Sequence, residues 1–250
     1  MKKILFSGAV LSLILMSCSS TKVATKADAG TYINTITAPE LSKHLYIVAG
    51  DEMQGRNTGE EGQKKAGKYL IEEYKKMGIS YPEAASDWYQ KVPSEFMKRG
   101  FAPKLNDSEN IWAFIKGSEK PDEILVISAH YDHVGIGRPD AAGDSIYNGA
   151  DDNASTCVAM LAIARAYKKQ PGKRTALFVF HGSEERGLLG SRWYASHPTV
   201  PEKDIIAVLN GDMIGRNNVN QAALLGSSSP HENSSDLVAI AKRANDEGPK

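Results

Sequence analysis

The sequence predicts an α/β protein with a mostly parallel central sheet and helices on both faces. Four short apolar segments have the length and composition of buried strands, namely 111–115, 124–129, 176–180 and 205–209. Helical patterns over 62–77, 155–168 and 187–196 precede or separate these strands. Strands that alternate with helices favour parallel pairing, with helices packed on the sheet.

The clearest helical pattern covers residues 62–77. Ala66, Leu70 and Tyr74 fall on one face, and lysines and glutamates fill the other. Gly78 follows the last turn and ends the helix. This pattern indicates a surface helix packed on the sheet. A second, shorter helix is predicted over Ala239–Asn245.

Composition indicates a globular domain without an electrostatic preference for nucleic acid. The chain has 250 residues, 41% hydrophobic and 24% charged, which suits one α/β domain with a sizeable core. Thirty basic residues balance thirty acidic ones. Proteins that bind nucleic acid normally show a basic excess, so no nucleic-acid partner is predicted.

The first 18 residues have the layout of a bacterial lipoprotein signal. Lys2 and Lys3 precede an apolar run over 4–16, too short for a comfortable membrane span. The run ends in Leu15-Met16-Ser17-Cys18, which resembles a lipobox. We expect a lipid on Cys18, a flexible tether over 19–38 and a folded domain over 39–250. The alternative is an ordinary signal peptide with an incidental cysteine.

The predicted lipid implies export and attachment to a membrane. Two serines and no acidic residue follow Cys18. By resemblance to lipoprotein sorting signals, the expected location in a Gram-negative cell is the outer membrane, facing the periplasm. Cys157 then has no partner, which excludes a disulfide framework. Its apolar, helical surroundings predict a small buried side chain rather than a reactive thiol.

Polar clusters follow each of three predicted strands. His130-Tyr131-Asp132-His133 follows strand 124–129, His181-Gly182-Ser183-Glu184-Glu185 follows 176–180, and Asn210-Gly211-Asp212 follows 205–209. Asp151-Asp152-Asn153 precedes the helix over 155–168. Ligands of open α/β sheets bind outside the carboxyl ends of the strands. The four clusters are therefore expected to converge at one edge.

The combination of these clusters predicts a metal site. Each cluster alone has an ordinary explanation: a surface histidine, a solvated glutamate pair, or a helix cap at Asp151-Asp152-Asn153. Together they place several carboxylates side by side, which is costly without a cation because like charges raise one another's pKa. Imidazole and carboxylate ligands suit zinc, and one carboxylate can bridge two ions.

These stretches resemble the M28 family of zinc metallopeptidases. The resemblance rests on 128–135, 148–155, 183–191 and 209–216, with a further match at Asp51-Glu52-Met53-Gln54-Gly55-Arg56-Asn57-Thr58-Gly59. It implies that His130 and Asp212 ligate one zinc, that Asp152 bridges two, and that Glu185 ligates the second. It further implies that Glu184 is the general base, that Asp132 orients the His130 ring, and that the Asp152–Asn153 peptide is cis.

The resemblance also implies a reaction and a substrate. A hydroxide bound to zinc would attack the peptide carbonyl, with Glu184 accepting the proton of the water and passing it to the leaving amine. A zinc that also holds the free amino terminus of a peptide would make the protein an aminopeptidase. The expected partners are thus a peptide substrate and two Zn²⁺ ions per complete site.

The sequence departs from the family pattern at three points. The second zinc usually takes a histidine well downstream of the last aspartate, and His231 in a polar loop is a poor match. We therefore expect the C-terminal part of the domain to be missing, with one zinc bound well and a sheet edge or apolar face exposed. Thr156 stands where glycine is usual, and Gly211 where a larger apolar residue is common.

Three other functions remain open on sequence grounds. A glutaminyl-cyclase-like transferase would share the fold and use one zinc. A binding lipoprotein would keep the fold without catalysis. A fragment would be catalytically incompetent. The Glu184-Glu185 pair and the bridging Asp152 favour hydrolysis over the cyclase reaction, and the intact ligand positions argue against a mere binding lipoprotein, whereas the incompetent fragment stays open.

Overall fold

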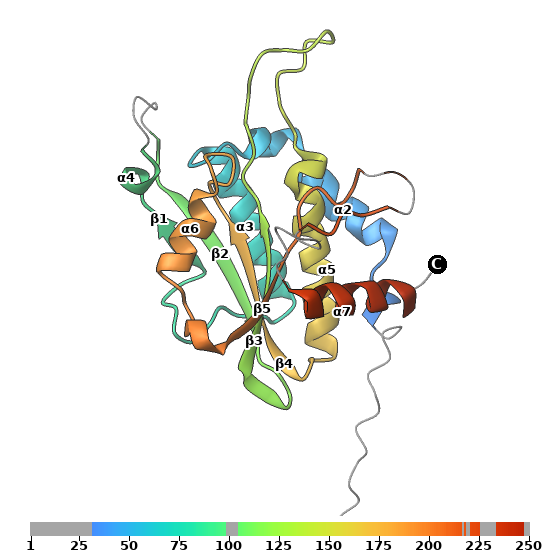
Figure 1. Ribbon diagram of the computed structural model, residues 1–250. Coiled ribbons are helices and arrows are strands. Elements are labelled where there is room, and N and C mark those ends of the chain that lie inside the picture. The colour runs from blue at the N-terminus through green and yellow to red at the C-terminus, as the bar shows by residue number, and fades with distance from the viewer. Residues whose placement is uncertain (1–31, 99–104, 217, 219–220, 226–233, 248–250) are drawn as a thin grey trace, which may run out of the picture.

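A five-stranded sheet forms the centre of the molecule (Figure 1). The computed structural model describes residues 32–98, 105–216, 218, 221–225 and 234–247. The strand order is β1-β2-β4-β3-β5. The strands are β1 (Tyr89–Val92), β2 (Ser108–Ile115), β3 (Lys120–His130), β4 (Arg174–His181) and β5 (Ile205–Asn210).

Four of these five strands point in the same direction. β3 pairs in parallel with both β4 and β5, whereas β2 pairs antiparallel with both β4 and β1. Within the described part of the chain, β2 alone runs against the others. The predicted α/β fold is confirmed, and the antiparallel pairs made by β2 make the sheet a mixed one.

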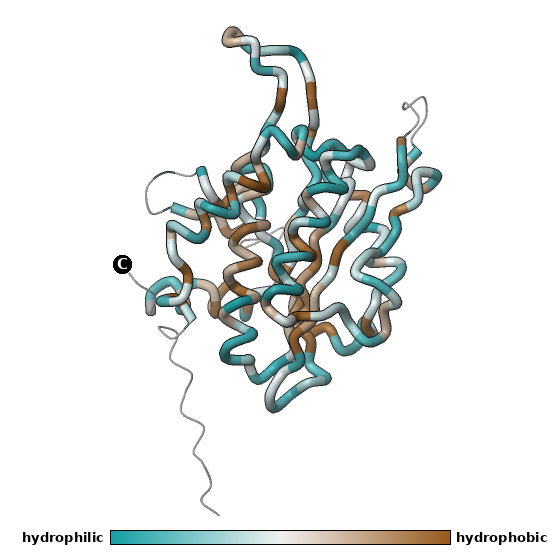
Figure 2. The backbone as a smooth tube through the Cα atoms, turned by 180° about the vertical axis from the view of Figure 1, so that it is seen from behind, coloured by the Kyte–Doolittle hydropathy of each residue, from teal (hydrophilic) through white to brown (hydrophobic). Residues whose placement is uncertain are grey.

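Helices cover both faces of the sheet, as predicted. The first face carries α2 (Ala38–Val48), α3 (Glu61–Lys76) and α5 (Thr156–Lys169), whose apolar residues share one core cluster with alternate residues of the strands. The second face carries α6 (Leu189–Ser196), whose Tyr194 packs with Trp112, Leu177 and Val179. Apolar segments accordingly run along the strands in the middle of the molecule (Figure 2).

The strand sequences explain this double-sided core. In β4, Phe178 and Phe180 face the first cluster while Leu177 and Val179 face the second, and all four are fully buried. Successive side chains of a strand point to opposite faces, so a continuous apolar run fits a sheet covered on both sides. In α3, Ala66, Leu70 and Tyr74 are fully buried four residues apart, which explains the predicted helix.

Several element boundaries differ from the predictions. Helix α6 begins at Leu189 rather than at residue 187, because Gly187 and Leu188 adopt left-handed backbone angles in the preceding turn. Helices α2 and α4 (Ser94–Met97) and strand β1 were not predicted. The helix predicted over Ala239–Asn245 is present as α7 (Ser235–Glu247).

Contacts with α5 place the last residues of the predicted tether on the folded domain. Arg165 donates a hydrogen bond to the carbonyl of Thr35, and the rings of Tyr32 and Tyr167 lie 6.3 Å apart. The segment 32–37 thus packs on the domain instead of linking it loosely. Cys18 and the rest of the predicted signal lie outside the described residues.

Strand β5 lies at the edge of the sheet. Among the described residues, its Ile206, Val208 and Leu209 are each about half exposed. Among the described helices, none combines the length and the apolar character needed to cross a membrane.

Candidate metal centre

The predicted site residues converge at the carboxyl edge of the parallel strands. His130 is the last residue of β3, and Asp212 follows β5. Glu184 and Glu185 lie in the turn between β4 and α6, and Asp152 lies in the turn that leads into α5. Parallel strands bring their carboxyl ends together, which explains how residues far apart in sequence meet here.

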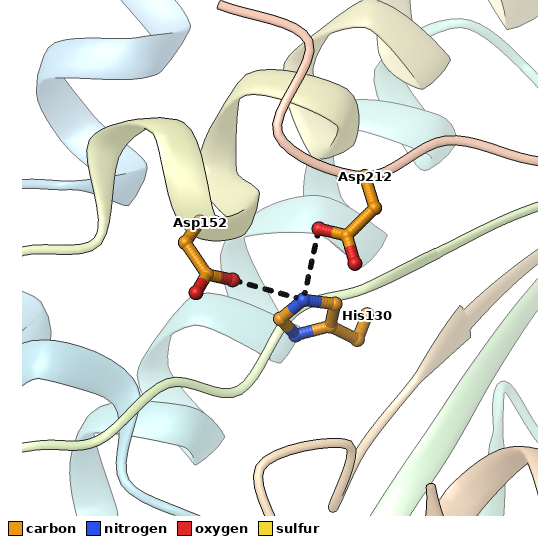
Figure 3. A group of neighbouring side chains, drawn as sticks. All are labelled: His130, Asp152 and Asp212. Atoms are coloured by element: carbon orange, nitrogen blue, oxygen red, sulfur yellow. Dashed lines mark ion pairs between the residues drawn. The ribbon is translucent and has the colours of Figure 1, made fainter. Parts of the chain in front are cut away.

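One group consists of His130, Asp152 and Asp212 (Figure 3). His130 Nε2 lies 3.0 Å from Asp152 Oδ1 and 3.4 Å from Asp212 Oδ1. The His130 side chain is 4% exposed, whereas the Asp212 side chain is 45% exposed. In this group the imidazole is therefore buried, whereas the Asp212 carboxylate faces solvent.

A second group consists of His133, Asp152 and Glu185. His133 Nδ1 lies 2.8 Å from Glu185 Oε1 and 3.9 Å from Asp152 Oδ2. The sequence had given Glu185 and Asp152 to one zinc but had given no role to His133. The signal for it was its place in the His130-Tyr131-Asp132-His133 run, three residues beyond the first predicted ligand.

The donor atoms of both groups suit zinc. In each group, one imidazole nitrogen and two carboxylate oxygens lie within 4.8 Å of one another. Three carboxylates, those of Asp152, Glu185 and Asp212, therefore share one small region, together with Glu184 at 4.0 Å from His130 Nε2. Repulsion among them is relieved by a divalent cation, and nitrogen with oxygen ligands is a common zinc environment.

Asp132 connects the ring of His130 to the backbone of Glu184. His130 Nδ1 lies 3.1 Å from the Asp132 backbone carbonyl but 3.8 Å from its carboxylate. The carboxylate instead accepts hydrogen bonds from the Thr58 hydroxyl at 2.6 Å and from the Glu184 amide at 3.0 Å. Asp132 therefore holds the ring mainly through its main chain, and its side chain fixes the position of Glu184.

Burial raises the pKa of both Asp132 and Glu184. Asp132 is fully buried, which raises its pKa against the opposing effect of the hydrogen bond from Thr58. Partial burial also raises the pKa of Glu184, and the nearby negative charge of Glu185 adds to this effect while His130 opposes it. Glu184 keeps an exposed fraction of 30%, so solvent and substrate can reach it.

The guanidinium of Arg56 holds the loops beneath the two groups. It is fully buried and donates five hydrogen bonds to five backbone carbonyls, those of Val48, Tyr131, Asn148, Gly149 and Asp152, at 2.7–3.4 Å. Burial lowers its pKa, and the surrounding acidic groups raise it. Every donor of the guanidinium is used, so the cation is buried without an unpaired N–H group.

The turn that carries Asp152 has an unusual backbone. The Asp152–Asn153 peptide is cis, as the resemblance implied. Gly149 has φ +58°, and a Cβ there would lie 2.5 Å from Cδ2 of the His133 ring. Glycine is therefore required at 149 both by its backbone angle and by the close approach of this ring.

The two smaller departures from the family pattern are in contact with each other. A Cβ on Gly211 would overlap Cγ2 of Thr156, while the Gly211 amide and carbonyl are hydrogen-bonded to the Ser128 carbonyl at 2.9 Å and to Asn153 Nδ2 at 3.0 Å. The backbone before Asp212 is thus clamped on both sides. The methyl group of Thr156 occupies the space that a larger residue at 211 would need.

Two other predicted features lie outside the metal groups. Cys157 is a free thiol whose predicted burial is confirmed, and burial raises its pKa to about 12. Burial lowers the pKa of His181 to about 4, and its ring belongs to neither group. His231 lies outside the described residues.

Solved structures of two peptidases and of a glutaminyl cyclase share this fold. The leucine aminopeptidase precursor of Bacteroides thetaiotaomicron superposes with a TM-score of 0.56 at 20% identity, covering 73% of this chain and 64% of that one. A zinc-dependent exopeptidase of Parabacteroides distasonis gives 0.54 at 20% identity, with 73% and 63% covered. A Bacteroides thetaiotaomicron glutaminyl cyclase gives 0.55 at 19% identity, with 73% and 63% covered.

The fold and the convergent histidine and carboxylate groups are those of a zinc metallopeptidase. The model of peptidase family M28 matches residues 110–248, more than half of the sequence, and the chain belongs to this family. A probable zinc metalloprotease of Pyrenophora tritici-repentis is 35% identical over 121 residues, and aminopeptidase YwaD of Bacillus subtilis is 36% identical over 110 residues.

These alignments cover only part of each protein. The first covers 48% of this chain and 26% of its relative, and the second covers 43% and 22%. The chain thus spans about a quarter of the length of these curated relatives in the aligned region. Both candidate metal groups consist of residues of this chain.

Substitution of Arg56 by lysine is expected to destabilise the protein by about 2–5 kcal/mol. Lysine has three donors, so at least two of the five buried carbonyls lose their partner, at about 1–3 kcal/mol each. Urea denaturation measures the change. The exposed Arg192→Lys is the control and should stay within about 0.5 kcal/mol of the wild type. Equal stability of the two variants would contradict the role given to Arg56.

A double-mutant cycle tests the contact between positions 156 and 211. Gly211→Ala alone is expected to cost about 1–3 kcal/mol because its methyl group overlaps Thr156 Cγ2. In the Thr156→Ala background the cost should fall by at least about 1 kcal/mol, since the nearest remaining atom is then Cβ at 3.4 Å. Additive effects in urea denaturation would show that the two positions do not interact.

Proposed function

We propose that the protein hydrolyses peptide bonds in a zinc-dependent reaction and that it removes residues from the free amino terminus of peptides. The observation that carries the proposal is the pair of histidine and carboxylate groups that share Asp152, with Glu184 beside them. Membership of peptidase family M28 supports peptide hydrolysis. The likeness to an aminopeptidase of Bacillus subtilis supports the exopeptidase mode.

The residues have distinct tasks in this proposal. His130, Asp152 and Asp212 would hold one zinc, and Asp152 with Glu185 would contribute to a second. When bound, zinc supplies Lewis acidity towards a peptide carbonyl and towards water. Glu184 takes the proton of the attacking water on its carboxylate and delivers it to the departing amine. The Asp132 carboxylate accepts a hydrogen bond from the Glu184 amide and so holds the backbone of Glu184 close to His130.

An open groove beside Asp152 provides room for a peptide. Three parts of the chain line it, namely Leu45 of α2, the segment 149–152, and Met213, Gly215 and Arg216 after β5. The lining atoms are mainly apolar at the surface of the groove. A peptide lying in this groove would be next to Asp152.

Removal of zinc and loss of Glu184 should each abolish hydrolysis of aminoacyl chromogenic substrates. Treatment with a chelator should remove activity, and added Zn²⁺ should restore it. Glu184→Gln should lower kcat by about 10²–10⁴-fold, the usual contribution of a general base, while zinc binding is retained. Glu202→Gln, on the exposed turn before β5, is the matched control. Wild-type turnover in Glu184→Gln would contradict the assignment.

The same fold occurs in glutaminyl cyclases, so a cyclase-like transferase is the second candidate. The cyclase would convert a peptide with an amino-terminal glutamine to its pyroglutamyl form with loss of ammonia. Incubation with such a peptide, followed by mass spectrometry, separates the two reactions. Loss of the whole first residue supports the aminopeptidase, whereas loss of ammonia alone supports the cyclase.

We further propose that a lipid on Cys18 anchors the protein to a membrane of the cell envelope. The support is the charged start, the apolar run and the lipobox-like end of residues 1–18. After expression in a bacterium with two membranes, the wild type should fractionate with the outer membrane and carry an acylated amino-terminal cysteine. Cys18→Ser should lack the lipid mass. An unmodified wild-type Cys18 would contradict the proposal.

A further inference from the structure

The proposed general base, Glu184, lies in a turn that depends on contacts from other segments. Its backbone amide donates a hydrogen bond of 3.0 Å to Asp132 Oδ1. The residue before it, Ser183, has a left-handed backbone with φ +64°, which is uncommon for a residue other than glycine. Such a conformation persists only where the surrounding structure imposes it. The bond from Glu184 to Asp132 is therefore one of the contacts that hold this turn.

The Asp132 carboxylate is in turn held by Thr58. Thr58 Oγ1 donates a hydrogen bond of 2.6 Å to Asp132 Oδ2, the oxygen that the Glu184 amide does not use. Thr58 and Asp132 are both fully buried, so solvent does not compete for this bond. A buried carboxylate is stabilised only by the donors that reach its oxygens. Removal of the Thr58 hydroxyl would leave Oδ2 without this donor and free the carboxylate to turn.

The position of Thr58 is fixed by its neighbours in the chain. Asn57 forms a short parallel bridge with His133, and the Gly59 amide donates a hydrogen bond to the Gln63 side chain in α3. The β-branched side chain of threonine is restricted about χ1. The main chain and the side chain thus both direct the hydroxyl, and Thr58 offers Asp132 a rigid donor from the turn before α3.

We propose that Thr58 is a positioning residue for Glu184. Its hydroxyl holds the Asp132 carboxylate, and Asp132 holds the backbone amide of Glu184, which places the Glu184 carboxylate for its proton transfer. The inference rests on the proposed function and deepens it by extending the support of the general base to the segment before α3. The competing role of Thr58 is a structural one, in which its bond to Asp132 stabilises the fold and leaves the general base unaffected.

Three substitutions and a control separate these roles. Thr58→Val keeps the branched shape and removes the hydroxyl, Thr58→Ala also removes it, and Thr58→Ser keeps it. Thr175→Val is the matched control, because Thr175 is also fully buried and its hydroxyl donates a hydrogen bond of 2.7 Å to the Pro121 carbonyl. Thr175 lies near the start of β4, at the opposite end of that strand from Glu184.

The first measurement needs no enzymatic activity. Hydrogen exchange of the Glu184 amide is followed by NMR on the ¹⁵N-labelled full chain with Zn²⁺ present, relative to the amide of Phe178 in the middle of β4, which corrects for overall unfolding. In Thr58→Val and Thr58→Ala this ratio should rise by about 10-fold or more, because the acceptor of the Glu184 amide is no longer held. In Thr58→Ser and Thr175→Val it should stay within about threefold of the wild type.

The second measurement is the hydrolysis of an aminoacyl chromogenic substrate. Thr58→Val and Thr58→Ala should lower kcat by about 10–100-fold, the range for loss of an outer contact, with KM within about threefold. Thr58→Ser and Thr175→Val should keep the wild-type kcat.

Three results would overturn the role given to Thr58. They are a wild-type kcat in Thr58→Val, an unchanged exchange ratio in that variant, and a loss in Thr58→Ser as large as in Thr58→Val. A wild type without turnover would instead overturn the proposed function, and the exchange ratio would still show whether Thr58 holds the backbone of Glu184.

Discussion

A single buried cation ties together the segments that make the site. The guanidinium of Arg56 holds the end of α2 at Val48, the segment after β3 at Tyr131 and the turn before α5 at Asn148, Gly149 and Asp152. Burying a charge is costly unless every donor is paired, and here each one meets a carbonyl. The positive charge also lies near Asp132, Asp152 and Glu185. The same side chain therefore fixes loop positions and offsets part of the negative charge gathered above it.

Sequence reasoning found what depends on local pattern and on strand direction. The apolar runs located β2 to β5, and the polar residues after them located His130, Glu184, Glu185 and Asp212, because parallel strands end at one edge. It missed features set by long-range packing. Strand β1 has mostly half-buried residues and no apolar run. Arg56 bonds to residues up to 96 positions away, and the His133 ring meets Glu185 and Gly149 only in the folded chain, which no local pattern reveals.

Two departures from the family pattern show why positions should be interpreted in pairs. Thr156 opens α5 and Gly211 follows β5, so in the sequence they look like independent exceptions. In the fold the two residues are neighbours, and each explains the other. The Thr156 side chain occupies the space that a side chain at position 211 would need. The backbone of Gly211 is hydrogen-bonded to Ser128 and Asn153. These bonds fix the course of the chain into Asp212 although position 211 has no side chain.

The position of Asp152 between His130 and His133 has a consequence for how the site fills. One carboxylate carries one negative charge, and a cation beside Oδ1 would draw on the charge available at Oδ2. Any cation held at one group would therefore change the affinity of the other group for a cation, by a coupling free energy that acts equally in both directions. The electrostatics of the two groups thus have to be considered as those of one unit, joined through a single side chain.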